Sequence, residues 1–126
     1  QRSIVNVGVP QGSILGPLLF LVYINDMPES LPPKIDCILY ADDTTLIANG
    51  SNPEEAREIV NDGMLHIESW CARNHLKLNT QKTSVVCLSL RNQSVTSSNM
   101  PCVNFLGCLV DRRLNFNLHC DSLCAR

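Results

Sequence analysis

The chain has 126 residues, of which 44% are hydrophobic and 17% are charged; this is enough apolar material for one domain core and excludes a wholly disordered chain. Ten basic against twelve acidic side chains give a net charge of −2, which excludes a protein that coats nucleic acid through overall basicity. The seven cysteines are odd in number and no two are spaced C-x-x-C, so we expect reduced thiols that pack as small hydrophobic residues, without a disulfide framework or zinc ribbon.

The N-terminal part of the chain is expected to lead from an extended segment into a helix. Residues 5–9 alternate apolar with small or polar side chains and reach a Pro-Gln-Gly-Ser turn at 10–13, the pattern of a strand that ends in a turn. Ser13 is placed to cap a helix whose first turn holds Pro17. Residues 18–24 are apolar on all sides, which predicts a helix buried in the centre of a domain.

No membrane-spanning or targeting segment is expected. The longest apolar stretch, residues 14–24, has eleven residues, whereas a bilayer needs about twenty. It also does not follow a basic N-terminal region, as a signal peptide does. We therefore expect an intracellular protein, in either the nucleus or the cytoplasm. Three prolines after this stretch predict a loop over 25–33.

Two short β-rich runs, residues 35–40 and 44–48, flank Ala41, Asp42 and Asp43. Their arrangement predicts a hairpin with the acidic pair at its turn. Adjacent carboxylates with limited access to water raise each other's pKa unless a cation neutralises them, and Mg²⁺ is a hard cation that prefers carboxylate, water and phosphate oxygens. The same pair also fits an ordinary solvated acidic turn, and both interpretations stay open at this point.

A complete two-metal site needs a further carboxylate from another element. Asp36 lies six residues before Asp42 on the same strand, about 20 Å away at about 3.3 Å per residue, so it cannot share the metal. Asp26 follows the apolar helix, and the sequence leaves its distance from the acidic pair open. We therefore expect the missing ligand to lie outside this chain.

A long amphipathic helix is expected over residues 53–73. It has two candidate start signals, Ser51 with Glu54 and Asn52 with Glu55, each an N-cap residue followed three positions later by Glu. Apolar side chains recur at three- and four-residue spacing, and we expect this face to pack against the sheet. Its members are Ala56, Ile59, Val60, Met64, Ile67, Trp70 and Cys71.

Within that helix, Gly63 interrupts the apolar face and allows close packing, and Asn74 is expected to end the helix. The rest of the chain is expected to hold two further strand pairs, a polar loop and a final helix. These elements are strands at 76–78 and 83–90 around a turn at 79–82, the loop 91–99, strands at 103–106 and 108–110 around Gly107, and a helix from 115 to 126. Hairpins mixed with helices predict an α+β fold with antiparallel sheet.

Four blocks of the sequence, in order, carry a resemblance to a known family. They are Gly8-Val9-Pro10-Gln11-Gly12-Ser13-Ile14-Leu15-Gly16-Pro17-Leu18-Leu19-Phe20; Tyr40-Ala41-Asp42-Asp43; Trp70 with Asn74-His75-Leu76-Lys77-Leu78-Asn79 and Lys82-Thr83; and Phe105-Leu106-Gly107 with Asp111, Leu114 and His119. These blocks resemble motifs B, C and D and the primer grip of reverse transcriptases, specifically those of non-LTR (LINE-type) retrotransposons.

The resemblance implies a right-hand polymerase fold of fingers, palm and thumb. Residues 1–126 would be a partial reverse transcriptase domain: an incomplete later palm, with the thumb starting at about 115–126. The family's motif A, which carries the third carboxylate, and the fingers residues that grip the triphosphate are absent from this sequence.

The resemblance also implies roles for individual residues. The metal ligands and catalytic residues would be Asp42 and Asp43. Lys82 would protonate the leaving pyrophosphate, and it fits a solvated turn lysine equally well. Contacts to nucleotide and template would come from Pro10, Gln11, Gly12 and Tyr40, and the primer grip from Phe105, Leu106 and Gly107. Gly12 suits this role because a residue without Cβ lets the backbone approach a base or sugar closely.

The expected function is RNA-directed DNA polymerisation, in which a primer 3′-hydroxyl attacks the α-phosphate of a deoxynucleotide with the help of two Mg²⁺ ions, Mn²⁺ being the alternative metal. The partners would be an RNA template, a DNA primer, deoxynucleoside triphosphates and the rest of the polymerase chain. We expect the 126 residues alone to be inactive. Two alternatives stay open: a non-catalytic retrotransposon-derived remnant that acts as a binding or packing module, and a group II intron maturase-like palm, which shares the Tyr-Ala-Asp-Asp turn.

Overall fold

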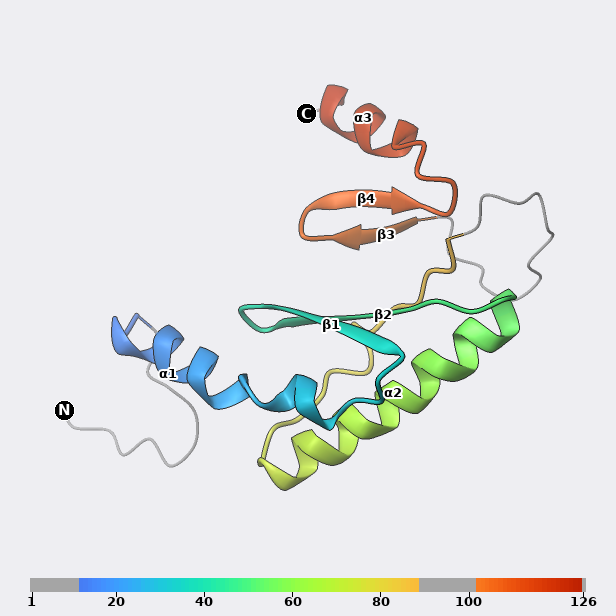
Figure 1. The fold of residues 1–126 in the computed structure, drawn as a ribbon. Helices are drawn as coiled ribbons and strands as arrows, with labels where there is room; N and C mark the ends of the chain where they lie inside the picture. Colours follow the sequence, from blue (N-terminus) through green and yellow to red (C-terminus); the bar gives the residue numbers. More distant parts are fainter. Residues whose placement is uncertain (1–11, 89–101, 126) are drawn as a thin grey trace.

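The computed structural model describes residues 12–88 and 102–125, in which helices are combined with two antiparallel hairpins (Figure 1). The elements are α1 (Leu15–Ile24), the 3₁₀ helix η1 (Met27–Ser30), β1 (Ile35–Tyr40), β2 (Asp43–Ala48), α2 (Pro53–Arg73), β3 (Cys102–Phe105), β4 (Cys108–Asp111) and α3 (Asn117–Cys124). This mixture confirms the expected α+β class. The extended segment expected at 5–9 and the loop expected at 91–99 lie outside the described residues.

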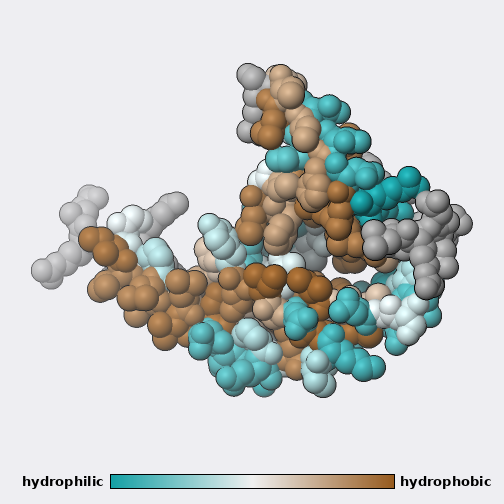
Figure 2. Space-filling model, turned by 45° about the horizontal axis from the view of Figure 1, so that its top comes forward, coloured by the Kyte–Doolittle hydropathy of each residue, from teal (hydrophilic) through white to brown (hydrophobic). Residues whose placement is uncertain are grey.

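Helix α1 begins at Leu15 with Ile14 at the N-cap position, one residue later than the predicted cap at Ser13. The Ser13 hydroxyl still accepts a hydrogen bond from the backbone N–H of Gly16 at 3.2 Å. The predicted burial of α1 on all sides is wrong, since only Gly16 and Ile24 are buried. The exposed large side chains of α1 are Leu15, Leu18, Leu19, Leu21, Val22 and Tyr23. In Figure 2 the surface over this helix is mostly hydrophobic. An all-apolar sequence shows that a helix has no polar face, but burial also requires other elements packed around it. Among the described residues, only the C-terminal half of α1 reaches the core.

The segment between α1 and β1 was expected to be a loop, and it contains the short helix η1. Pro28 stands in its first turn. A backbone N–H at this position has no partner within the helix, so the N–H that proline lacks is not missed. The Ser30 hydroxyl donates to the carbonyl of Met27 at 2.7 Å, and the Met27 side chain is buried. Proline in this segment therefore starts a helical turn at Pro28, whereas the sequence analysis took all three prolines as signs of a loop. Neither this helix nor any other described one is long and apolar enough to cross a membrane.

Strands β1 and β2 form the first hairpin, with Ile35 opposite Ala48 and Tyr40 opposite Asp43. The strand β2 begins one residue earlier than predicted, so the turn itself contains only Ala41 and Asp42. Ile35 is buried on the face that meets α2, while Ile38 and Ile47 are exposed.

Helix α2 has the predicted bounds. Of its two candidate start signals the structure uses the later one: the Asn52 side chain accepts from the backbone N–H of Glu55 at 2.7 Å, and the Glu55 carboxylate accepts from the N–H of Ser51 at 2.8 Å. At the other end, the backbone N–H and side-chain amide of Asn74 both donate to the carbonyl of Trp70. The local capping chemistry therefore fixes both ends of the helix.

Helix α2 lies along the first hairpin (Figure 1) and contacts both of its strands, as predicted; it also contacts η1. The buried cluster consists of Ile24, Met27, Ile67, Trp70 and Cys71, with Phe20, Leu31, Leu39, Leu46, Leu76 and Leu78 packed around it. Full burial of one such aliphatic side chain stabilises a fold by about 1.5–3 kcal/mol. Gly63 faces the hairpin, and a Cβ there would overlap Cδ1 of Ile35, which confirms its role in close packing.

The strands predicted at 76–78 and 83–90 are absent from the described part, which extends to residue 88. The predicted turn is present, because the N–H of Lys82 donates to the carbonyl of Asn79 at 3.1 Å. Leu76 and Leu78 alternate toward the core, but this segment has no hydrogen-bonded partner strand among the described residues. The alternating apolar residues Leu76 and Leu78 thus reflect packing against the core, and not strand pairing in a sheet.

Strands β3 and β4 form the second hairpin, and α3 packs on β4. β3 lies one residue before its predicted bounds, and β4 starts as predicted and ends one residue later. Leu106 and Gly107 make the turn with φ angles of 47° and 86°. Positive φ at both central residues is the type I′ pattern that suits the twist of a two-residue hairpin. The final helix starts at Asn117, two residues later than predicted, and is described to Cys124.

All seven cysteines lie in the described residues, and none of them is joined in a disulfide there. Burial raises the pKa of the Cys37 and Cys71 thiols, which disfavours their thiolate forms. Packing as a core hydrophobe holds for Cys71, whereas Cys120 and Cys124 are exposed on α3.

Candidate metal and nucleic-acid site

The acidic pair lies at the tip of the first hairpin. Asp42 is the second residue of the two-residue turn, and Asp43 opens β2 opposite Tyr40. The residue before them, Ala41, has a left-handed φ of 52°, a conformation that costs a non-glycine residue about 1–2 kcal/mol. Strain of this kind concentrates at functional turns.

Both carboxylates are exposed to solvent, so the limited access to water expected from the apolar flanks is wrong for the described residues. The flanking strands contact α2, whereas residues 41–44 at the tip are all exposed. Exposed oxygens fit a hard divalent cation that keeps part of its water shell. The hairpin therefore presents two oxygen donors to whatever approaches its tip.

The donor set is incomplete within the chain. All twelve acidic residues belong to the described part, and there no group of three His, Cys, Asp or Glu side chains is placed to hold a metal ion. Asp36 pairs with Ile47 near the opposite end of the hairpin, as the strand length predicted. Asp42 and Asp43 thus fit a divalent ion as part of a larger ligand set.

The other predicted site residues are spread over several elements. Tyr40 is the only one adjoining the acidic pair in the described hairpin, and its side chain is exposed. Gly12 has a φ of 82° and open space around it, while Pro10 and Gln11 lie outside the described residues. Lys82 lies in the exposed turn after residue 79. No hydrogen bond or ion pair joins these described residues to the carboxylates.

The predicted primer-grip residues form the tip of the second hairpin. Phe105 ends β3, and Leu106 and Gly107 make its turn. The side chains of Phe105 and Leu106 are both exposed, so neither is packed in a core of the described residues.

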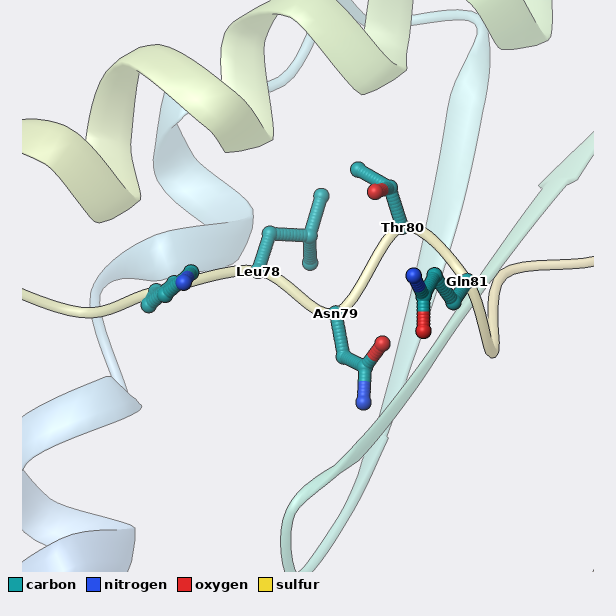
Figure 3. Close-up of a pocket in the computed structure, with 5 residues that line it drawn as sticks. Leu78, Asn79, Thr80 and Gln81 are labelled. Carbon is teal, nitrogen blue, oxygen red and sulfur yellow. The ribbon is translucent and has the colours of Figure 1, made fainter.

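A concave surface of about 480 Å³ lies along the segment after α2, lined by Lys77, Leu78, Asn79, Thr80 and Gln81. In Figure 3, Leu78 and Thr80 point to one side of the segment and Asn79 to the other. The acidic pair does not line it. Binding of a divalent metal ion needs carboxylate ligands, and this lining has none. We therefore place the candidate metal site at the tip of the first hairpin.

Two sets of contacts were not foreseen from the sequence. The Tyr23 hydroxyl donates to the backbone carbonyl of Asn74, and its ring meets that of Trp70 edge-on with centroids 6.4 Å apart. These contacts tie α1 to the end of α2, and no local sequence signal announces them.

The second set links β4 to α3. The Asp111 carboxylate accepts from the backbone N–H groups of Arg113, Asn115 and Phe116 at 2.8, 3.1 and 3.0 Å. These donors, with that of Arg113 first, lower the pKa of Asp111. An Asp at the end of a strand and just before a helix is a recognisable signal for such a side-chain cap, although the sequence analysis assigned it none.

Comparison with known proteins identifies similar sequences along most of the chain. The sequence profile described as "Reverse transcriptase (RNA-dependent DNA polymerase)" matches residues 1–110. The chain is 32% identical to the "Probable RNA-directed DNA polymerase from transposon X-element" of Drosophila melanogaster over 97% of its own length and 15% of that protein.

Two further relatives cover similar parts of the chain. Identity is 26% to the "RNA-directed DNA polymerase from mobile element jockey" of Drosophila melanogaster, over 94% of this chain and 14% of the relative. It is 27% to the "Retrovirus-related Pol polyprotein from type-1 retrotransposable element R1 2" of Nasonia vitripennis, over 89% and 31% respectively. The chain spans less than a third of the length of each of these relatives. No solved structure matches it.

Proposed function

Because the chain belongs to the reverse transcriptase (RNA-dependent DNA polymerase) family, we propose that it is a palm segment of an RNA-directed DNA polymerase from a non-LTR retrotransposon. The proposal extends over residues 1–126 as a partial domain, with α3 as the start of the thumb. It is supported by the family match over residues 1–110 and by relatives that are named as polymerases of transposons.

The proposed reaction transfers a deoxynucleotide to the 3′-hydroxyl of a primer that is paired with an RNA template. Reverse transcriptases use divalent metal ions, and we propose Mg²⁺ here, with Mn²⁺ as the alternative. When bound, the ions stabilise the negative charge on the attacking and leaving oxygens. Asp42 and Asp43 would hold them from the hairpin tip, where both carboxylates are exposed, and the short turn would fix the spacing of the pair.

The remaining proposed roles concern substrate and proton positions. Pro10, Gln11, Gly12 and Tyr40 would contact nucleotide or template, and Phe105, Leu106 and Gly107 would support the primer backbone. Lys82 would give a proton to the leaving pyrophosphate, a contribution of about 10²–10⁴-fold for a well-placed general acid. Its exposure in a turn leaves it free to reach a phosphate.

The observation that carries the proposal is the exposed acidic pair on a tight hairpin inside a segment matched by the family. The test is primer extension on an RNA template by a full-length polymerase that contains this segment. We expect Asp42→Ala to lower the rate at least about 100-fold, since charge stabilisation at the reacting centre is a major term.

Asp36→Ala is the matched control, because it removes an exposed carboxylate from the far end of the same hairpin. It should leave the rate within about twofold, and both variants should melt within a few degrees of the wild type, as exposed substitutions do. An Asp42→Ala enzyme that keeps most of its rate would refute the assignment.

The incomplete ligand set supports a second proposal about the isolated chain. We expect the 126 residues by themselves to incorporate no nucleotide, because two carboxylates without a third ligand do not hold the reacting groups in place. Measurable incorporation by the purified chain would contradict this. The same observation favours a non-catalytic binding or packing module as the second candidate function, and the transposon names of the relatives favour either candidate over a maturase.

A further inference from the structure

The connection between β4 and α3 is held by one carboxylate. Residues 111–116 turn sharply, with left-handed φ angles of 56° at Leu114 and 57° at Phe116. The side chain of Asp111 accepts from three backbone N–H groups of this turn, and its own carbonyl accepts from that of Leu114 at 3.0 Å. Asp111 therefore pairs with the N–H groups of residues 113–116, and without its carboxylate a turn with two left-handed non-glycine residues loses most of its hydrogen bonds.

A second contact attaches the body of α3 to the same strand. The backbone N–H of Leu109 donates to Nδ1 of His119 at 3.3 Å. Inside α3, the N–H of Cys120 donates to the carbonyl of Phe116 at 3.0 Å. The helix is thus joined to β4 both before its first residue and within its first turn.

These contacts make the second hairpin and α3 one unit. The hairpin tip, with exposed Phe105 and Leu106, is only three residues of β4 away from Asp111. A change in the 111–116 turn therefore changes the angle between α3 and the strand that carries the tip. We propose that Asp111 is a positioning residue, which sets the orientation of α3 relative to the hairpin tip and through it the grip on the primer strand; the inference rests on the proposed function.

The sign of the effect separates this role from simple electrostatics. Removing a negative side chain near a nucleic-acid surface should tighten primer binding, because it removes repulsion from the phosphates. Loss of positioning should weaken binding instead. Asp121 supplies the matched control: it carries the same charge in α3, is exposed, and its side chain makes no hydrogen bond in the described structure.

The first measurement uses the 126-residue chain. Amide hydrogen exchange at Arg113, Asn115 and Phe116 should be at least about tenfold faster in Asp111→Ala than in wild type, and intermediate in Asp111→Asn, which keeps one acceptor oxygen. Asp121→Ala should leave these amides unchanged. Equal exchange in wild type and Asp111→Ala would overturn the inference, and fluorescence of the buried Trp70 checks that the rest of each variant is folded.

The second measurement uses a full-length polymerase that contains this segment. Asp111→Ala should raise the Kd for primer–template about tenfold, with the KM for deoxynucleotide within about twofold, because only the primer side is misplaced. Asp111→Asn should fall between Asp111→Ala and wild type, and Asp121→Ala should bind primer as tightly as wild type or more tightly. A wild-type enzyme that binds no primer–template would overturn the proposed function. A wild type that binds, with Asp111→Ala binding equally well or better, would overturn this inference alone.

Discussion

Gly63 and Ile35 meet where α2 crosses the first hairpin, and their contact gives a quantitative test of the fold. A methyl group added at Gly63 would overlap Cδ1 of Ile35 and would lie 3.4 Å from Cδ1 of Leu46. Ile35 is only 8% exposed, so its side chain has little room to turn away. Gly63→Ala gains about 1 kcal/mol of helix propensity and loses about 1–3 kcal/mol to overpacking. We expect a net loss of about 1 kcal/mol.

Ile35→Val removes the atom that the new methyl group would strike. Alone, it should cost about 1 kcal/mol through lost burial. In the double variant, the methyl added at position 63 fills the space left by Cδ1, the overlap disappears and the helix gain remains. The double variant should therefore unfold with a free energy within about 0.5 kcal/mol of wild type, where independent effects would give a loss of about 2 kcal/mol.

Urea unfolding followed by Trp70 fluorescence measures all four proteins, since Trp70 is the only tryptophan and is 4% exposed. As a control, Ile35→Val combined with Asn61→Ala, a change on the exposed side of α2, should be additive. A coupling below about 0.5 kcal/mol between positions 35 and 63 would refute the packing of α2 on the hairpin.

Two further predictions concern the helix cap and acid stability. Asn52→Ala removes the acceptor for the Glu55 N–H and should lower the free energy of unfolding by about 1 kcal/mol; a urea midpoint equal to that of wild type would contradict it. The N–H of Ser51 lowers the pKa of Glu55, and that of Arg113 lowers the pKa of Asp111, so the stability from both is complete above about pH 5 and is lost as pH falls through the lowered values. The urea midpoint should fall between pH 5 and 2, less steeply in Glu55→Gln, and an identical slope in the two proteins would show that the Glu55 contact is absent.

The sequence predicted best those elements whose signals are local. The predicted bounds of α2 were correct because the cap residues and the helical spacing of apolar residues both lie within or next to the helix. The hairpin with Asp42 and Asp43 was also located correctly, to within one residue at the turn. Burial of α1 and strands after residue 76 were predicted wrongly, since both depend on which distant element supplies a neighbour.

The same distinction holds for the site. Asp42 and Asp43 could be found from the sequence around them, but their exposure could not, because it depends on which distant element packs against the hairpin. The hydrogen bond from Tyr23 to Asn74 joins residues 51 positions apart and leaves no trace in either local sequence. The carboxylate of Asp111 accepts from backbone N–H groups two to five residues ahead, so its role was open to prediction and was missed.

Tyr40 pairs with Asp43 across a two-residue turn, so the lengths of β1, the turn and β2 are fixed relative to one another. Alternate side chains of a strand point to opposite faces, so inserting or deleting a single amino acid in β1 or β2 would reverse every side chain beyond it. Ile35 or Leu46 would then turn away from α2, or the carboxylates would change sides. The hairpin should therefore tolerate many point substitutions but almost no insertions or deletions. A copy of the gene with one codon gained or lost here would encode a hairpin that cannot both pack against α2 and keep Asp42 and Asp43 in their present orientation.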